Sequence, residues 1–206
     1  MLKNFTVIEG NIGSGKTTLS KMISAEYKAN LILEEFEENP FLTDFLADQK
    51  VNPLGVELQF LIDRFHQLKQ HINNNQPTVA DYFIEKSLIF SSNNLSKIEK
   101  TLFDSYYNIL FEKATSPDIL FYLSVNEDRL IHNIKKRGRG NEKELTKGYL
   151  KSIHDSYITY IKNKTKQKTV IVDVSDIDFV ENSNEYEYLK EIIIGNHKEH
   201  LSQIKL

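Results

Sequence analysis

A glycine-rich segment near the start of the chain has the residue types that hold a polyphosphate. Residues 10–17 read GNIGSGKT, a complete GxxxxGK[ST] match, between the apolar run 5–8 and a helix-like pattern. Glycines let consecutive backbone N–H groups turn toward phosphate oxygens, and a following helix adds its positive end. Lys16 is placed to reach the β- and γ-phosphates and Thr17 to bind Mg²⁺. The sequence therefore predicts a nucleoside triphosphate site, with contacts from Gly10, Asn11, Ile12, Gly13, Ser14, Gly15, Lys16, Thr17 and Thr18.

Acidic residues end two other short apolar runs. Glu34 follows residues 31–33, and Asp81 follows residues 78–80. Continuous apolar runs suit a parallel sheet that is buried on both faces, and ligands of such sheets bind beyond the carboxyl ends of the strands. Both carboxylates should therefore face the same crevice as the glycine-rich segment. The alternatives are a solvated acidic run for Glu34 and, for Asp81, the N-cap of a helix that starts near Phe83.

The elements that position these residues alternate between strand-like and helix-like patterns. Two further apolar runs, 119–123 and 170–172, bring the expected strands to about five. Such a series predicts a three-layer α/β fold, a parallel sheet flanked by helices. No linker or repeat interrupts the chain, so we expect one domain over residues 1–206. The helices are expected at residues 53–72, 97–115, 126–136, 145–163 and 184–205.

Composition argues against several other classes of protein. The chain has no cysteine, which excludes disulfides and cysteine-ligated zinc, and its six histidines form no HxxxH pair. A net charge of −3 argues against a binder of nucleic-acid polymers. No apolar run approaches the roughly 20 residues that cross a bilayer, and the N-terminus lacks a signal-peptide pattern. We expect a cytoplasmic chain with no membrane partner.

A basic segment follows the helix-like pattern at 126–136. Arg137 and Arg139 are separated by one glycine, so the segment can close over a phosphate. Arginine suits a transferring phosphoryl group because its planar fork gives two donors and keeps its charge. The alternative is a cationic helix end that the helix dipole stabilises.

These motifs occur in a characteristic order along the chain. The sequence reads EGNIGSGKTTL at 9–19, EEFEENPFL at 34–42, QLKQ at 67–70, DY followed by LIF within 81–90, and KKRGR at 135–139. In combination they resemble the deoxynucleoside kinase family, in its bacterial deoxyguanosine/deoxyadenosine kinase branch. The resemblance implies a P-loop kinase fold with a short arginine lid at about 137–145. It also implies ATP-dependent phosphorylation of the 5′-hydroxyl of a purine deoxynucleoside in nucleotide salvage, Mg²⁺ as the metal, and a homodimer formed through helices that flank the sheet.

The resemblance also implies roles for single residues. Glu34 is expected to accept the proton of the 5′-hydroxyl, alongside Lys16 and the two lid arginines in catalysis. Asp81 is expected to hold Mg²⁺ partly through water, complementing Thr17. Glu142 matches a position that contacts the sugar 3′-hydroxyl.

Glu57 and Arg64 are seven residues apart, so they share one helix face, which by the resemblance reads the base. Many relatives carry glutamine at the position of Glu57. An ionised carboxylate only accepts hydrogen bonds, and guanine presents two N–H donor groups on one edge, so Glu57 fits guanine well. Adenine, with one donor group beside an acceptor, pairs less completely unless Glu57 is protonated or Arg64 helps. The alternative is that Glu57 is a solvated helix carboxylate. The sequence leaves both purines open.

The chain departs from many relatives at three positions. Tyr82 follows Asp81 where arginine is common, Leu46 stands where a tyrosine lies near the sugar, and Asn133 replaces a lid arginine. These departures keep a non-catalytic nucleotide-binding subunit as one rival interpretation. The other rival is a nucleoside monophosphate kinase such as thymidylate kinase, which needs extra cations to hold the phosphate of the acceptor.

Overall fold

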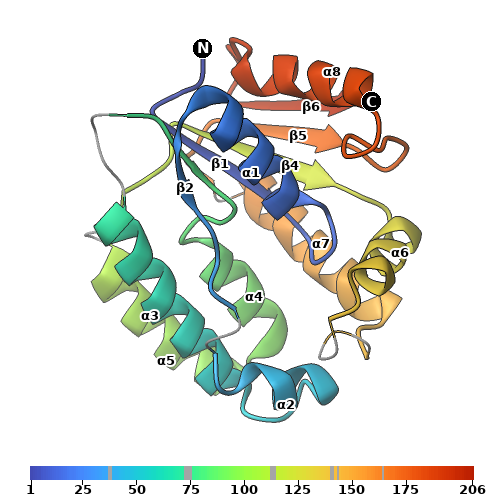
Figure 1. The fold of residues 1–206 in the computed structure, drawn as a ribbon. Coiled ribbons are helices and arrows are strands. Elements are labelled where there is room, and N and C mark those ends of the chain that lie inside the picture. Colours follow the sequence, from blue (N-terminus) through green and yellow to red (C-terminus); the bar gives the residue numbers. More distant parts are fainter. Residues whose placement is uncertain (37–38, 72–75, 112–114, 140–141, 143, 164) are drawn as a thin grey trace.

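The computed structural model describes residues 1–36, 39–71, 76–111, 115–139, 142, 144–163 and 165–206. In this part of the chain, six strands form one sheet in the order β2-β3-β1-β4-β5-β6 (Figure 1). All five pairings are parallel. The strands are β1 (Phe5–Gly10), β2 (Asn30–Ile32), β3 (Thr78–Ala80), β4 (Ile119–Ser124), β5 (Thr169–Asp173) and β6 (Leu201–Lys205).

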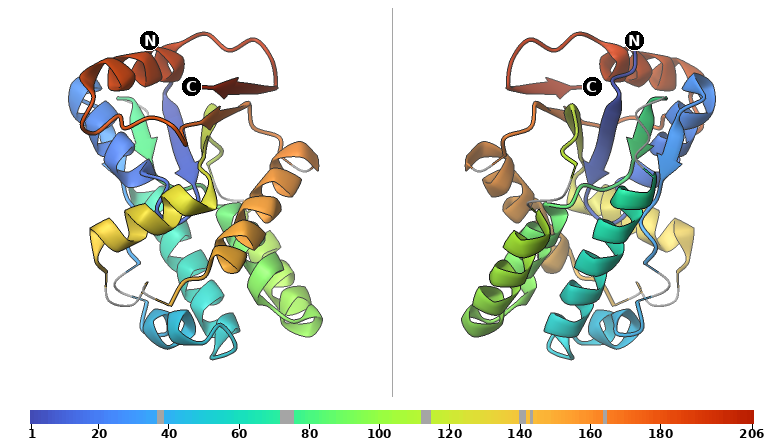
Figure 2. Two further views of the ribbon diagram at one scale, coloured as in Figure 1. Left: turned by 90° about the vertical axis from the view of Figure 1, so that its right-hand side faces the viewer. Right: turned by 90° about the vertical axis from the view of Figure 1, so that its left-hand side faces the viewer.

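Helices cover both faces of the sheet, which confirms the expected three layers (Figure 2). One face carries α1 (Lys16–Tyr27) and α8 (Ser183–Ile194), with α6 (Glu127–Arg137) toward the carboxyl edge of the strands. The other face carries α3 (Pro53–His71), α4 (Lys86–Asn94), α5 (Lys97–Phe111) and α7 (Lys147–Asn163). The short helix α2 (Leu42–Ala47) precedes α3. None of the described helices is both long and apolar enough to span a membrane.

Side chains of the central strands point alternately into two cores. In β4, Phe121 packs in a cluster with Leu19 of α1 and Leu189 of α8. Its neighbour Tyr122 packs in the opposite cluster with Tyr157 of α7. All five of these side chains are buried, so the continuous apolar runs do mark strands covered on both faces.

The last expected helix is wrong in its second half. Helix α8 ends at Ile194, and residues 201–205 form β6 beside β5. Gly195 stands at the end of α8 in an extended conformation, and glycine at this position is a usual end of a helix. The sheet therefore has one strand more than expected. The other helices lie close to their expected ranges, although α2 was not expected and residues 72 and 112–114 lie outside the described residues.

The turn between β1 and α1 depends on its glycines. Gly13 and Gly15 have φ of 84° and 88°, in the region that side chains with a Cβ atom rarely adopt. A Cβ atom on Gly13 would lie 2.9 Å from the carbonyl oxygen of Leu130. From the same helix, α6, Nδ2 of Asn133 donates a hydrogen bond to the Gly13 carbonyl at 2.8 Å. Helix α6 thus holds the glycine-rich loop from outside.

Candidate active site

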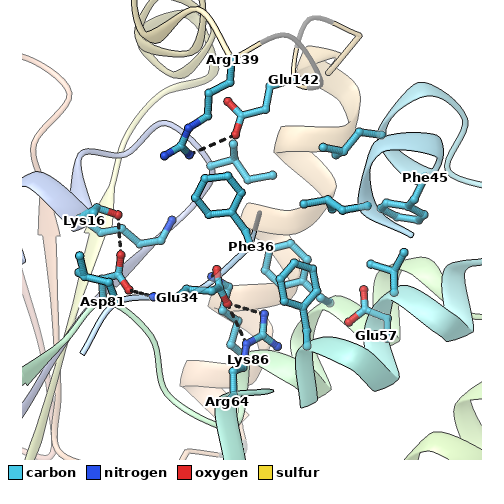
Figure 3. A pocket seen from close by; sticks show the side chains of 18 of the residues that line it. Lys16, Glu34, Phe36, Phe45, Glu57, Arg64, Asp81, Lys86, Arg139 and Glu142 are labelled. Atoms are coloured by element: carbon cyan, nitrogen blue, oxygen red, sulfur yellow. Dashed lines mark hydrogen bonds and ion pairs between the residues drawn. The ribbon is translucent and has the colours of Figure 1, made fainter. Parts of the chain in front are cut away.

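A cavity of about 240 Å³ opens at the carboxyl ends of the strands, where the strand-end acids predicted a crevice. It collects residues from the glycine-rich loop, the ends of β2 and β3, helices α3 and α4, and the basic segment (Figure 3). Figure 3 shows Lys16 and Asp81 at one side, Glu57 at the other and Glu34 between them. Ten of the predicted site residues line this cavity: Ile12, Lys16, Thr17, Glu34, Glu57, Arg64, Asp81, Arg137, Arg139 and Glu142.

The rest of the glycine-rich segment lies elsewhere. Gly13, Ser14, Gly15 and Thr18 line a second hollow of about 260 Å³, together with side chains from α6 and from residues 174–180. Gly10 and Asn11 are buried beneath the loop. There Nδ2 of Asn11 donates to the Leu150 carbonyl at 2.6 Å, and its Oδ1 accepts from the Ile12 amide at 2.8 Å. Asn11 therefore ties the loop to the body of the fold.

Asp81 joins two parts of the site. Its Oδ2 accepts a hydrogen bond from the Thr17 hydroxyl at 2.5 Å, and its Oδ1 accepts one from the backbone N–H of Glu34 at 2.8 Å. The alternative role as a helix N-cap is wrong, because α4 begins only at Lys86, with Glu85 at its N-cap position. Burial and the repulsion of Lys86 lower the pKa of nearby Lys16 to about 8.

Glu34 is held by two cations, one on each carboxylate oxygen. Nη2 and Nε of Arg64 lie 2.6 and 2.8 Å from Oε1, and Nζ of Lys86 lies 2.7 Å from Oε2. Burial raises the pKa of the Glu34 carboxyl, but Lys86 and Arg64 outweigh burial, so its pKa lies well below its usual range. Glu34 is therefore an ionised, oriented hydrogen-bond acceptor, and the alternative of a solvated acidic run fails for it. Glu37 and Glu38 lie outside the described residues.

The far end of the cavity is largely apolar around one buried carboxyl. Glu57 is 1% exposed, and its Oε1 accepts from Nδ2 of Asn94 at 2.7 Å. Its Oε2 is buried without a hydrogen-bond partner among the described residues. Tyr149 in turn donates to Oδ1 of Asn94 at 3.3 Å. Burial raises the pKa of Glu57 to about 7, against the opposing effect of Arg64 and Asn94.

Arg64 does line the cavity from the same helix as Glu57, as their spacing predicted. Its guanidinium, however, is directed at Glu34 and at Ser87, whose hydroxyl accepts from Nη1 at 2.7 Å. The face of α3 that we expected to recognise the base therefore also holds Glu34, the predicted catalytic residue.

The two lid arginines meet on one carboxylate. Arg137 forms an ion pair with Oε2 of Glu142, and Arg139 lies 3.6 Å from Oε1 of the same residue. The Arg139 guanidinium also stacks 4.0 Å from the ring centre of Phe36. Positions 140, 141 and 143 of the expected lid lie outside the described residues.

The three departures from the family pattern have different surroundings. Tyr82 is fully buried in the core, and its hydroxyl donates to Oε1 of Gln67 at 2.7 Å. Asn133 holds the glycine-rich loop instead of carrying a lid charge. Leu46 lines the apolar end of the cavity.

Sequence reasoning missed two polar residues of α4 that line the cavity, Lys86 and Asn94. With Phe90 they are spaced i, i+4 and i+8, so they share one helix face. That spacing within a run of small and apolar residues is a signal that could have identified them. Tyr149, at the start of α7, carries no comparable signal in the sequence.

Comparison with known proteins agrees with this geometry. A family model described as deoxynucleoside kinase matches residues 6–197. Deoxyguanosine kinase of Bacillus subtilis is 34% identical over 202 residues, covering 92% of this chain and 98% of that relative. Deoxyadenosine kinase of Lactobacillus acidophilus is 28% identical over 200 residues, covering 90% of this chain and 93% of that relative.

A solved structure of a deoxynucleoside kinase has the same fold as this chain. The structure of deoxyadenosine kinase from M. mycoides with bound dATP superposes with a TM-score of 0.80 at 25% identity, covering 93% of this chain and all of that one. The glycine-rich loop, the strand-end acids and a match over nearly the whole length lead to one conclusion: the chain belongs to the deoxynucleoside kinase family and is a phosphotransferase that acts on deoxynucleosides.

Proposed function

We propose that this enzyme transfers the γ-phosphoryl group of ATP to the 5′-hydroxyl of a purine deoxynucleoside, guanine being the preferred base, and that it works in the cytoplasm. The observation that carries the proposal is the place of Glu34. Glu34 lies between the glycine-rich loop and the apolar end of the cavity. Its carboxylate is ionised, and each of its two oxygens forms an ion pair, one with Arg64 and one with Lys86. A sugar alcohol that reaches Glu34 from the Glu57 side then faces the loop that holds the phosphates.

The donor fits the glycine-rich loop and the hollow behind it. Arg129 and Asn133 of α6, with Phe179 and its neighbours, line this hollow beside Gly13 and Thr18. We infer that the nucleoside part of ATP lies there, since the triphosphate then extends over the loop toward Lys16 and the cavity.

Two oxygen-bearing side chains at the phosphate end support Mg²⁺ as the metal. Thr17 and Asp81 bring a hydroxyl and a carboxylate into contact at the phosphate end. Mg²⁺ prefers such hard oxygen donors, keeps several waters, and is usually held by one or two carboxylates plus the phosphates of the substrate. The two residues therefore fit this metal, and when bound it supplies charge neutralisation for the phosphates.

The lid arginines suit the transferring group. Arg137 and Arg139 point their forks at Glu142 and line the same cavity as Lys16. In this proposal the arginines exchange that carboxylate for phosphoryl oxygens, and Glu142 is released to accept from the sugar 3′-hydroxyl. Carboxylate and phosphate are the two anions that the arginine fork recognises in the same geometry.

Guanine preference rests on Glu57. Its Oε2 has no partner among the described residues, and guanine offers N1–H and N2–H₂ to a carboxylate. A relative that is 34% identical is a deoxyguanosine kinase, which agrees with this choice.

The test is a turnover screen with ATP and Mg²⁺ over the four deoxynucleosides and their four monophosphates. Phosphorylation of deoxyguanosine and, more slowly, deoxyadenosine is the expected result. Faster turnover of any monophosphate would replace the proposal by a monophosphate kinase, and a pyrimidine preference would overturn the assignment of the base.

We also propose that two copies assemble through α5. Its outer face carries a stripe of exposed apolar side chains at Ile98, Leu102, Tyr106 and Ile109. Large exposed apolar patches mark interaction sites on soluble proteins, and a flanking helix is where the family resemblance puts the contact between copies.

A further inference from the structure

Lys86 is a buried lysine among carboxylates at the centre of the cavity. It is 3% exposed, and its Nζ lies 2.7 Å from Oε2 of Glu34 and 3.9 Å from Oε1 of Glu9 (Figure 3). A buried ammonium group is costly unless it is paired, and these pairs offset the cost. A lysine kept in such a place suggests a use beyond packing.

The start of α4 directs this side chain into the site. The backbone after β3 makes a turn, in which the Lys86 N–H donates to the Phe83 carbonyl at 3.1 Å, and the helix begins at Lys86. One turn later, the ring of Phe90 lies 5.5 Å below the Lys86 ammonium. Asn94, a further turn along, contacts Glu57. A single helix therefore places Lys86 at Glu34 and Asn94 at the far end of the cavity.

Lys86 and Arg64 form ion pairs with different oxygens of the Glu34 carboxylate. Arg64 occupies Oε1 from α3, and Lys86 occupies Oε2 from α4. Two donors from two helices fix the plane of the carboxylate, so its remaining lone pairs point in defined directions. A substrate hydroxyl can then donate to Glu34 in one geometry only.

Lys86 also acts on the phosphate side. Lys16 and Lys86 are both lining residues of the cavity, and the repulsion of the Lys86 ammonium adds to burial in lowering the pKa of Lys16. Both line the same cavity as Asp81. This part of the cavity lies between the glycine-rich loop and Glu34, where the negative charge of the transferring group develops in a phosphoryl transfer.

We propose that Lys86 is a positioning residue for the reaction: it orients Glu34 and supplies the cation on the acceptor side of the phosphoryl site. The residue immediately after the strand-end acid Asp81 is Tyr82, which is buried and bonded to Gln67, so that position supplies no charge to the cavity. Lys86, four residues later, brings a positive charge into the cavity from the first turn of α4.

This inference rests on the proposed role of Glu34. In the step, the 5′-oxygen forms a bond to the γ-phosphorus, and the bond to the β–γ bridging oxygen breaks with its electron pair leaving on ADP. The hydroxyl proton passes to a Glu34 oxygen. Lys86 keeps Glu34 ionised before the step and offsets negative charge during it.

The experiment compares Lys86→Met and Lys86→Arg with the wild-type enzyme, using deoxyguanosine, ATP and Mg²⁺. Lys86→Met should lower kcat by about 100-fold, a typical loss for one oriented charged donor, with a smaller change in KM. Lys86→Arg should recover at least about tenfold of that loss, because it restores the charge. Binding of an ATP analogue should stay within about threefold, since the glycine-rich loop is intact.

The kcat-against-KM split and the rescue by arginine separate positioning from simple stability. A fold defect alone should lower the concentration of active sites, measured by titration with the ATP analogue, whereas loss of positioning should lower kcat per active site and be restored by Lys86→Arg. Lys190→Met is the matched control, because Lys190 on α8 is also paired with carboxylates but is not among the described residues that line the cavity. It should keep the wild-type kcat and KM.

The outcomes distinguish this inference from the proposed function. If the wild-type enzyme phosphorylates deoxyguanosine and Lys86→Met stays within threefold of it, or Lys86→Arg is no more active than Lys86→Met, this inference is overturned alone. A wild-type enzyme that phosphorylates none of the four deoxynucleosides overturns the proposed function and this inference together. If Lys86→Met does not fold, Lys86→Gln, which keeps a hydrogen-bond donor without the charge, provides the same readouts.

Discussion

A carboxylate that takes a proton from an alcohol usually works best with a pKa near the working pH. The contacts of Glu34 have the opposite effect, since Lys86 and Arg64 hold its pKa well below its usual range. Phosphoryl transfer tolerates this, because in most analyses its transition state is loose and catalysis depends on position and charge more than on proton abstraction. We therefore propose that Glu34 acts first as an oriented acceptor and receives the proton late, when the new O–P bond has made the hydroxyl acidic.

Glu34→Gln should lower kcat by about 100-fold or more, because the amide cannot take the proton and presents a donor where an acceptor is needed. Affinity for ATP should change by less than about threefold, since Glu34 makes none of the contacts of the loop. Steady-state kinetics and binding of a fluorescent ATP analogue measure the two effects. Glu35→Gln is the control, since Glu35 is exposed beside it. A near-wild-type rate for Glu34→Gln would remove Glu34 from the chemistry.

Glu57 is the opposite case, because burial raises its pKa to about 7. Below that pH the carboxyl is neutral and can donate as well as accept, which suits adenine; above it the carboxylate only accepts, which suits guanine. The ratio of kcat/KM for deoxyguanosine to that for deoxyadenosine should therefore increase about tenfold between pH 6 and pH 8.5. Glu57→Gln should make the ratio independent of pH and shift it toward adenine. A wild-type ratio that does not change with pH would exclude Glu57 as the group that reads the base.

At the scale of the element, the predictable parts of the site were those that a strand end positions. The glycine-rich loop, Glu34 and Asp81 each follow a short apolar run, and the carboxyl ends of parallel strands share one edge. Lys86 was not predictable in the same way, because its place depends on a turn that delays the start of α4 beyond the expected Phe83. The strand β6 was missed because its half-buried residues continue a pattern that also suits an amphipathic helix.

The loop between β1 and α1 also depends on particular residues, because its backbone conformation requires glycine at Gly13. Gly13→Ala would strain a residue with φ of 84° and bring a Cβ atom to 2.9 Å from both the Leu130 carbonyl oxygen and Cγ1 of Ile134. The left-handed conformation alone costs about 1–2 kcal/mol. The melting temperature should therefore fall by about 2–8 °C, and affinity for ATP should fall at least about tenfold as α6 is displaced from the loop.

The matched control for this prediction is Gly148→Ala. Gly148 lies near the start of α7 without a positive φ, and a Cβ atom there would find only Thr146 Oγ1, at 3.8 Å. Alanine favours a helix over glycine, so this variant should melt at or above the wild-type temperature. Scanning calorimetry and titration with ATP compare the two variants. Equal behaviour of Gly13→Ala and Gly148→Ala would show that the conformation of the loop is not required for binding.

At the scale of the whole molecule, the cavity and the apolar stripe of α5 lie on different surfaces. The described residues that line the cavity come from the glycine-rich loop and α1, from the segments after β2 and β3, from α2, α3 and α4, from the basic segment with Glu142, and from the start of α7. None of them comes from α5. Helix α5 buries Phe103 and Tyr107 on its inner side and exposes Ile98, Leu102 and Ile109, which are 84%, 59% and 67% exposed, on its outer side. Exposed apolar patches of this kind mark interaction sites, and we propose this side of α5 as the contact between two copies.

A pair of facing α5 helices is a small contact. Fifteen residues span about 22 Å, whereas a stable interface buries on the order of 800 Å² on each partner. The proposed contact must therefore extend onto neighbouring helices, with the apolar stripe of α5 at its centre, where substitutions have the largest effect.

Leu102→Glu and Ile109→Glu together should convert the proposed dimer to a monomer in analytical ultracentrifugation, because they bring four like charges to the interface between two copies.

The turnover of deoxyguanosine should survive this change within about threefold, provided that the monomer stays folded, because α5 contributes none of the described residues at the cavity. Tyr188→Glu is the control, since Tyr188 is an exposed apolar side chain of α8, on the opposite face of the sheet. It should leave the dimer intact. A wild-type chain that sediments as a monomer at micromolar concentration would refute the proposed assembly, and a dimer that persists in the double variant would place its interface away from α5.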